Sequence, residues 1–171
     1  VGASICYAVK ANGNLSILQL LSRLGCGMDI VSGGEMERAL EAGAPASRII
    51  FSGVGKSPSE IAKALIAGVH QINVDSPAEF HLVADIAASL RLRAPIALRV
   101  NPDVDARTHE KISTGKKGDK FGVALSEVAG LFEAAAGRPE VDMVGLAVHI
   151  GSQILDLAPY RGAYGVLADL V

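Results

Sequence analysis

The sequence lacks a charge excess and a long apolar run, and both absences limit what the protein can bind. Its 16 basic and 18 acidic residues nearly cancel, so no overall electrostatic field would attract nucleic acid or an anionic membrane surface. No apolar run approaches the ~20 residues needed to cross a bilayer, and no signal peptide opens the chain. We therefore expect neither a nucleic-acid nor a membrane partner.

Cysteine is also scarce. The two cysteines, Cys6 and Cys26, lie in separate predicted elements and form neither a metal-ligand spacing nor a disulfide framework. The basic cluster Lys111–Lys120 has no interleaved aromatic residue before Phe121, which favours a solvated loop over a nucleic-acid surface. The sequence thus predicts a cytoplasmic protein without a metal site.

The chain does have enough apolar residues for one domain. Half of its 171 residues are hydrophobic, which suffices for a sizeable core. It lacks an initiator methionine and begins almost inside a predicted strand, so we expect it to be part of a longer protein and to be inactive by itself.

Short apolar runs alternate with helical patterns along the chain. Six β-type runs are separated by segments with helical periodicity. The predicted strands are Ile5–Val9, Met28–Val31, Arg48–Phe51, Gln71–Val74, Ile96–Val100 and Met143–Ile150, and the predicted helices are Leu15–Leu24, Glu35–Ala42, Glu60–Ala67, Ala78–Leu90, Ser126–Ala136 and Tyr160–Val171. This alternation predicts parallel βαβ units, either in a (β/α)8 barrel or in an open doubly wound sheet. Six units are too few to close a barrel, so a barrel would be incomplete here.

Three of the helices share a start signal. Ser32, Ser57 and Ser76 are each followed three residues later by glutamate. In this capping box the serine oxygen accepts the third helical amide, and the glutamate accepts the amide of the serine. Glycines at positions 25, 43 and 68 follow helices, as left-handed C-terminal caps do.

Polar residues stand where the predicted strands end. Parallel sheets of both kinds bind ligands at the carboxyl ends of their strands. Lys10, Asp29, Ser52, Asp75, Asn101 and His149 lie at or near six such ends. We expect them to meet at one opening.

The segment SGVGKS, residues 52–57, follows a strand like the end of a phosphate-binding loop of the form GxxxxGK[ST]. The first glycine of that motif would fall on Ile50, inside the strand, so the segment cannot wrap a triphosphate. We interpret Lys56 as a residue of the rim or the surface.

Five segments together carry a family resemblance. In order and spacing, YAVKAN, GMDIVSGGE, INVDS, RVNPDVDARTHEKISTGKKGDKFG and HIGSQI resemble the barrel domain of diaminopimelate decarboxylases, within the alanine-racemase-like class of pyridoxal-phosphate enzymes. The resemblance implies a partial parallel (β/α)8 barrel over residues 1–171, with the remaining barrel units and a C-terminal β-domain elsewhere in the protein. It also implies a homodimer and pyridoxal 5'-phosphate as cofactor.

The resemblance assigns roles to five residues. Lys10 would bind the cofactor aldehyde covalently and act in catalysis, and a partly desolvated site would favour its neutral, nucleophilic amine. His149 would stack on the cofactor ring, and Ser152 would reach the phosphate. Asp29 and Arg99 would lie near the attachment point and give electrostatic support.

The implied reaction is decarboxylation of meso-2,6-diaminopimelate to L-lysine and CO2, the last step of lysine biosynthesis. Alternatives are a decarboxylase of the ornithine or arginine type, a racemase, or a non-catalytic pyridoxal-phosphate-binding barrel. The long polar loop Pro102–Gly118 favours an enzyme, and we interpret it as a mobile loop on the substrate side. Lys120 matches a motif position, but the residues suggest no role for it.

Overall fold

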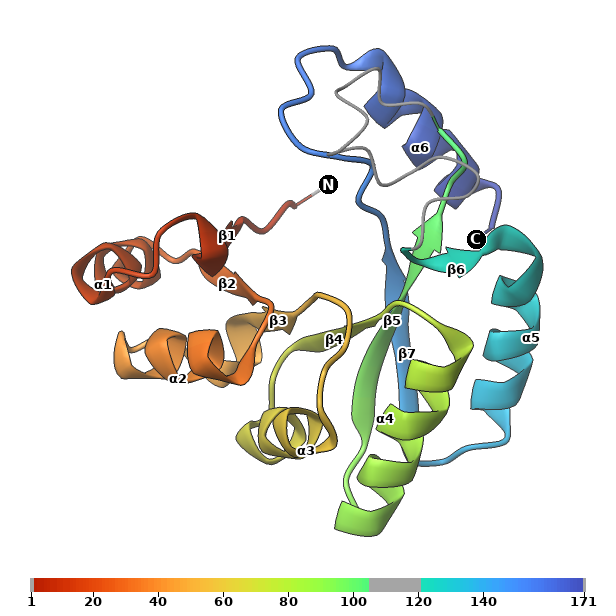
Figure 1. The fold of residues 1–171 in the computed structure, drawn as a ribbon, viewed down its shortest axis with the longest axis horizontal. Helices are drawn as coiled ribbons and strands as arrows, with labels where there is room; N and C mark the ends of the chain where they lie inside the picture. Colours follow the sequence, from red (N-terminus) through yellow and green to blue (C-terminus); the bar gives the residue numbers. More distant parts are fainter. Residues whose placement is uncertain (1, 105–120, 171) are drawn as a thin grey trace.

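Strands and helices alternate through the described chain, which comprises residues 2–104 and 121–170 of a computed structural model (Figure 1). The strands are β1 (Cys6–Ala8), β2 (Gly27–Ile30), β3 (Ile49–Phe51), β4 (Gln71–Val74), β5 (Ala94–Asn101), β6 (Val123–Ala124) and β7 (Val141–Ala147). The helices are α1 (Leu15–Arg23), α2 (Gly33–Glu41), α3 (Pro58–Ala67), α4 (Pro77–Leu90), α5 (Leu125–Ala136) and α6 (Ala158–Ala168), and short 3-10 turns cover Val9–Ala11 and Ala46–Arg48.

All strand pairs are parallel. β1 to β5 pair in chain order, and β7 pairs with β5 from Ala94 to Arg99. Helices α1 to α5 lie on the convex side of the curved sheet, as Figure 1 shows, whereas an open doubly wound sheet has helices on both faces. The chain therefore forms part of a parallel (β/α)8-type barrel, and within the described residues β1 and β7 do not pair with each other.

The core lies between the sheet and these helices. Met28, Ile30, Ile72 and Val74 are fully buried there, and they alternate along their strands with residues that are only partly buried. Strand side chains alternate between the two faces, so the partly buried positions face the concave side. Polar side chains such as Asp29 are therefore held on the concave face.

The predicted helix starts are confirmed, but two of the three glutamates have a different partner from the one expected. Ser32, Ser57 and Ser76 each accept a hydrogen bond from the amide three residues later. Only α3 has the complete capping box among these three starts, because Glu60 accepts the Ser57 amide at 3.0 Å. Glu35 instead accepts the amide of Val31, one residue before the cap, and Glu79 likewise accepts the amide of Asp75.

Three strands end earlier than the apolar pattern predicts, and among them β2 ends at Ile30 instead of Val31. β1 ends at Ala8, where the chain enters the 3-10 turn that carries Lys10, and β7 ends at Ala147, two residues before His149. The short strand β6 was not expected, because it has two residues and no apolar run of its own. The basic cluster 111–120 and most of the loop 102–118 lie outside the described residues. Within the described ranges, no helix has the length and hydropathy of a membrane span.

Glu60 joins two successive units. Its carboxylate accepts the Gly33 amide of α2 at 2.7 Å, together with the hydroxyl and the amide of Ser57. These hydrogen bonds, that of Gly33 first, lower the pKa of Glu60 to about 2. The stabilisation is thus complete above the ordinary glutamate pKa of 4.5 and is lost as the pH falls toward 2.

We therefore expect Glu60→Gln to destabilise the complete protein by about 1 kcal/mol at pH 6, the usual magnitude of a lost helix cap. The difference from wild type should shrink as the pH falls below 4.5. Urea unfolding of both proteins at pH 6 and pH 3 measures this difference in the free energy of unfolding. Glu37→Gln, which removes an exposed pairing with Lys63, is the control and should show no comparable trend. Equal destabilisation by Glu60→Gln at both pH values would contradict the charge-based explanation.

Candidate functional site

A cavity of about 700 Å³ opens on the concave face at the carboxyl ends of the strands. Strand residues form its wall, and Tyr164 and Leu167 of α6 also line it. Figure 1 shows α6 above the carboxyl ends of β5 and β7. All five site residues expected from the sequence line this cavity, namely Lys10, Asp29, Arg99, His149 and Ser152.

Lys10 stands at the rim of the cavity. The 3-10 turn after β1 carries it, while the neighbouring Val9 is buried in the core. Lys10 itself is exposed, which differs from the partly desolvated position expected from the sequence. Lys10 projects from the turn that follows β1, and within the described structure β1 has a strand neighbour on one side only.

A chain of hydrogen bonds fixes Asp29 on the cavity wall. The Ser52 hydroxyl donates to Asp29 Oδ1 at 2.5 Å, Asn73 Nδ2 donates to Ser52 Oγ at 2.9 Å, and Gln71 Nε2 donates to Asn73 Oδ1 at 2.6 Å. Burial raises the pKa of Asp29, opposed first by the Ser52 hydrogen bond and then by the positive charge of Lys10. Three adjacent strands thus hold one carboxylate in place.

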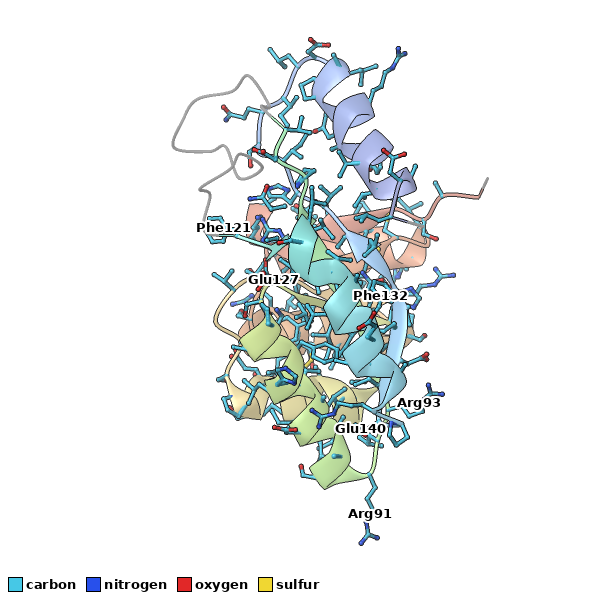
Figure 2. All side chains as sticks on the ribbon, turned by 90° about the vertical axis from the view of Figure 1, so that its right-hand side faces the viewer. Arg91, Arg93, Phe121, Glu127, Phe132 and Glu140 are labelled. Atoms are coloured by element: carbon cyan, nitrogen blue, oxygen red, sulfur yellow. The ribbon has the colours of Figure 1, made fainter. Side chains whose placement is uncertain are left out.

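Arg99 is held from two sides. Its Nη1 donates to Asp75 Oδ1 at 2.7 Å, and its guanidinium lies 5.4 Å from the centre of the Phe121 ring. Figure 2 shows Phe121 beside the start of α5, whereas Arg93 and Glu140 lie near the other end of that helix. Because only 13% of the Arg99 side chain is exposed, its charge stays beside the cavity.

His149 and Ser152 follow β7 and line the cavity. His149 keeps an exposed edge, but the surrounding wall partly desolvates the ring and lowers its pKa, and the positive charges of Arg99 and Lys10 add to this effect. Between the two residues, Gly151 has φ +144°, in the region that favours glycine. Because its pKa is lowered from 6.5, the His149 imidazole is mainly neutral at pH 7.

Two strand-end residues and Lys56 lie elsewhere than expected. Asp75 and Asn101 do not line the cavity, although Asp75 reaches it through Arg99. The interpretation of Lys56 as a rim or surface residue is wrong, because its side chain is fully buried. Its ammonium finds three hydrogen-bond acceptors behind the cavity wall, which makes burial possible.

Sequence reasoning missed Gln71 and Asn73 as residues of the wall. Their signal is the alternation in QINV, where two polar residues share one face of a strand whose other face is apolar. The sequence places Ser52 at a strand end, but its hydrogen bond to Asp29 in the cavity wall was not predicted. Across residues 2–104 and 121–170, no three His, Cys, Asp or Glu side chains are grouped to hold a metal ion.

Comparison with known proteins identifies relatives over almost the whole chain. Residues 2–170 match the family model described as pyridoxal-dependent decarboxylase, pyridoxal binding domain. Diaminopimelate decarboxylase from Pseudomonas aeruginosa is 48% identical over 167 residues, which cover 98% of this chain and 40% of that protein. The chain therefore spans about 40% of the length of this curated relative.

Solved structures share the fold. Diaminopimelate decarboxylase from Helicobacter pylori complexed with L-lysine superimposes with a TM-score of 0.96 at 48% identity, covering 98% of this chain and 43% of that chain. Lysine decarboxylase from Selenomonas ruminantium gives a TM-score of 0.84 at 29% identity, covering 98% of this chain and 41% of that one.

The environment of His149 predicts its titration. We expect its midpoint in the complete protein to fall below 6.5, because burial and two nearby cations disfavour the imidazolium. Replacing one of those cations, as in Lys10→Met, should raise the midpoint. Proton NMR of the histidine ring signals measures both values, with His149→Gln providing the assignment. A midpoint at or above 6.5 in the wild type would contradict this picture of the cavity.

Proposed function

Because the chain belongs to the pyridoxal-binding domain family of the pyridoxal-dependent decarboxylases, we propose that its protein decarboxylates meso-2,6-diaminopimelate to L-lysine and CO2. The observation that carries the proposal is the gathering of Lys10, Asp29, Arg99 and His149 around one cavity. The substrate assignment is supported by the 48% identity with two diaminopimelate decarboxylases, against 29% with a lysine decarboxylase.

The cavity suits the cofactor of this family, pyridoxal 5'-phosphate. Its volume of about 700 Å³ lies in the range of small-molecule sites. The donor set also matches the parts of the cofactor, since an amine, an imidazole and a hydroxyl can meet an aldehyde, an aromatic ring and a phosphate. Lys10 would hold the aldehyde carbon, His149 the ring face and Ser152 the phosphate.

When bound, the cofactor supplies a ring that takes up the electron pair left behind as a carboxylate departs as CO2. The chain's own residues position and transfer protons around it. The Lys10 amine would react with the cofactor aldehyde as the free base, so its proton would have to leave first. Lys10 could later return a proton to the substrate carbon. His149 would pack against the cofactor ring, and its lowered pKa favours the uncharged imidazole there.

Asp29 and Arg99 set the electrostatics of the same wall. The Asp29 carboxylate favours a positive charge on a neighbouring nitrogen, and Ser52 fixes the direction of its Oδ1. Arg99 offers a positive charge beside the cavity, and Asp75 limits its movement. The pair therefore gives the cavity an anionic and a cationic side.

The proposal extends to the rest of the protein. Residues 1–171 would be the first part of the cofactor-binding barrel, with further barrel units and a β-domain completing the site. Two copies would form a homodimer. The share of its relatives' length that the chain spans, about 40%, supports this division.

The assignment of Lys10 is tested by trapping. Borohydride reduction of the complete protein with bound pyridoxal 5'-phosphate should attach the pyridoxyl group to Lys10, which peptide mass spectrometry locates. Lys10→Ala should abolish both the attachment and CO2 release from diaminopimelate, because no other amine replaces it. Lys63→Ala, at an exposed lysine of α3, is the control and should retain both. Attachment at another lysine, with a fully active Lys10→Ala variant, would refute the assignment.

A further inference from the structure

Lys56 is a buried cation directly behind the cavity wall. None of its side chain is exposed, and its ammonium donates to the Gly53 carbonyl at 2.6 Å, the Asn73 carbonyl at 2.7 Å and Glu79 Oε1 at 3.0 Å. These three hydrogen bonds use all three ammonium protons. Burying a charge is costly unless it is paired and hydrogen-bonded, so an arrangement this complete indicates a strong requirement for the cation at this position.

Two of the three acceptors belong to the cavity wall. Gly53 lines the cavity and follows Ser52, and Asn73 lines it from β4. The side chains of Ser52 and Asn73 form the hydrogen-bond chain that ends on Asp29. Lys56 thus holds the backbone carbonyl of Asn73 and that of Gly53, the residue after Ser52, on the side of the wall away from Asp29.

The charge of Lys56 also reaches Arg99. Asp75 lies between the two cations, with Oδ1 2.7 Å from Arg99 Nη1 and Oδ2 4.0 Å from Lys56 Nζ. Within the described structure, that Oδ2 is buried and has no hydrogen-bond partner, so the nearby ammonium is its main compensation. Together with Glu79, the cluster has two positive and two negative side chains.

We propose that Lys56 is a positioning residue for the cofactor cavity, fixing Asp29 through the Gly53 and Asn73 carbonyls and Arg99 through Asp75. Without the ammonium, the cluster keeps two carboxylates and only the cation of Arg99, which is drawn toward them and away from the cavity. The two carbonyls lose their donor, and the orientation of Ser52 and Asn73 toward Asp29 relaxes. The inference rests on the proposed cofactor role of the cavity.

The test measures the equilibrium dissociation constant for pyridoxal 5'-phosphate by absorbance titration of the complete protein. Lys56→Met keeps the length of the side chain and removes its charge, and we expect it to raise the constant at least tenfold. The double variant Lys56→Met/Glu79→Gln preserves the charge balance, which guards against a failure to fold. It should still raise the constant at least fivefold, because the two carbonyls remain without their donor.

Two controls separate positioning from stability. Lys63→Met removes an exposed lysine of the same helix region, and Ile61→Ala destabilises the core on the convex side of the sheet. Both should leave the constant within twofold of wild type when measured well below each variant's Tm. The Tm and the far-UV circular dichroism of every variant show that the protein measured is folded.

The outcomes distinguish the two proposals. A wild-type protein that does not bind pyridoxal 5'-phosphate contradicts the proposed function itself. A wild type that binds, with unchanged constants in the folded Lys56 variants or an equal rise in Ile61→Ala, overturns the role of Lys56 alone. Failure of both Lys56 variants to fold also counts against the proposal, since it would make Lys56 a requirement of the fold rather than of the cavity.

Discussion

Because helices α1 to α5 cover only the convex face of the sheet, its two faces carry different chemistry. Every second strand residue must fill the space against a helix, and Met28, Ile30, Ile72 and Val74 do so without exposed surface. The residues between them face the concave side, where no helix packs against them, so they can be polar. Asp29 and Asn73 therefore reach the cavity directly from regular strands, which position a side chain more rigidly than loops do.

The fold was predictable from local signals that act over few residues. The serine caps and the glycine C-terminal caps depend on hydrogen bonds within one helical turn, so the sequence around Ser57 and Gly68 is sufficient to place α3. Lys10 and His149 could be located because a strand's apolar run ends visibly near them. Their gathering at one cavity follows from the parallel arrangement, which brings all carboxyl ends to the same side.

The environment of Lys56 could not be derived in this way. Its three acceptors come from its own loop, from β4 and from α4. No local sequence pattern predicts that these three segments meet around the ammonium. The glycines of SGVGKS invite a comparison with phosphate-binding loops, but here Gly53 has φ +88° and approaches Val31 closely. The prediction that residues at the strand ends meet at one opening fails for Asp75 for a related reason. Asp75 follows β4, but its carboxylate contacts Lys56 and Arg99.

The hydrogen bond from the Gly33 amide to Glu60 has a consequence for the newly made chain. Helix α2 receives one of the acceptors for its first turn from α3, which is synthesised 27 residues later. As the chain leaves the ribosome, α2 is thus incompletely capped until the next βα unit has emerged and docked. The first turn of α2 is thus completed only after α3 has been synthesised.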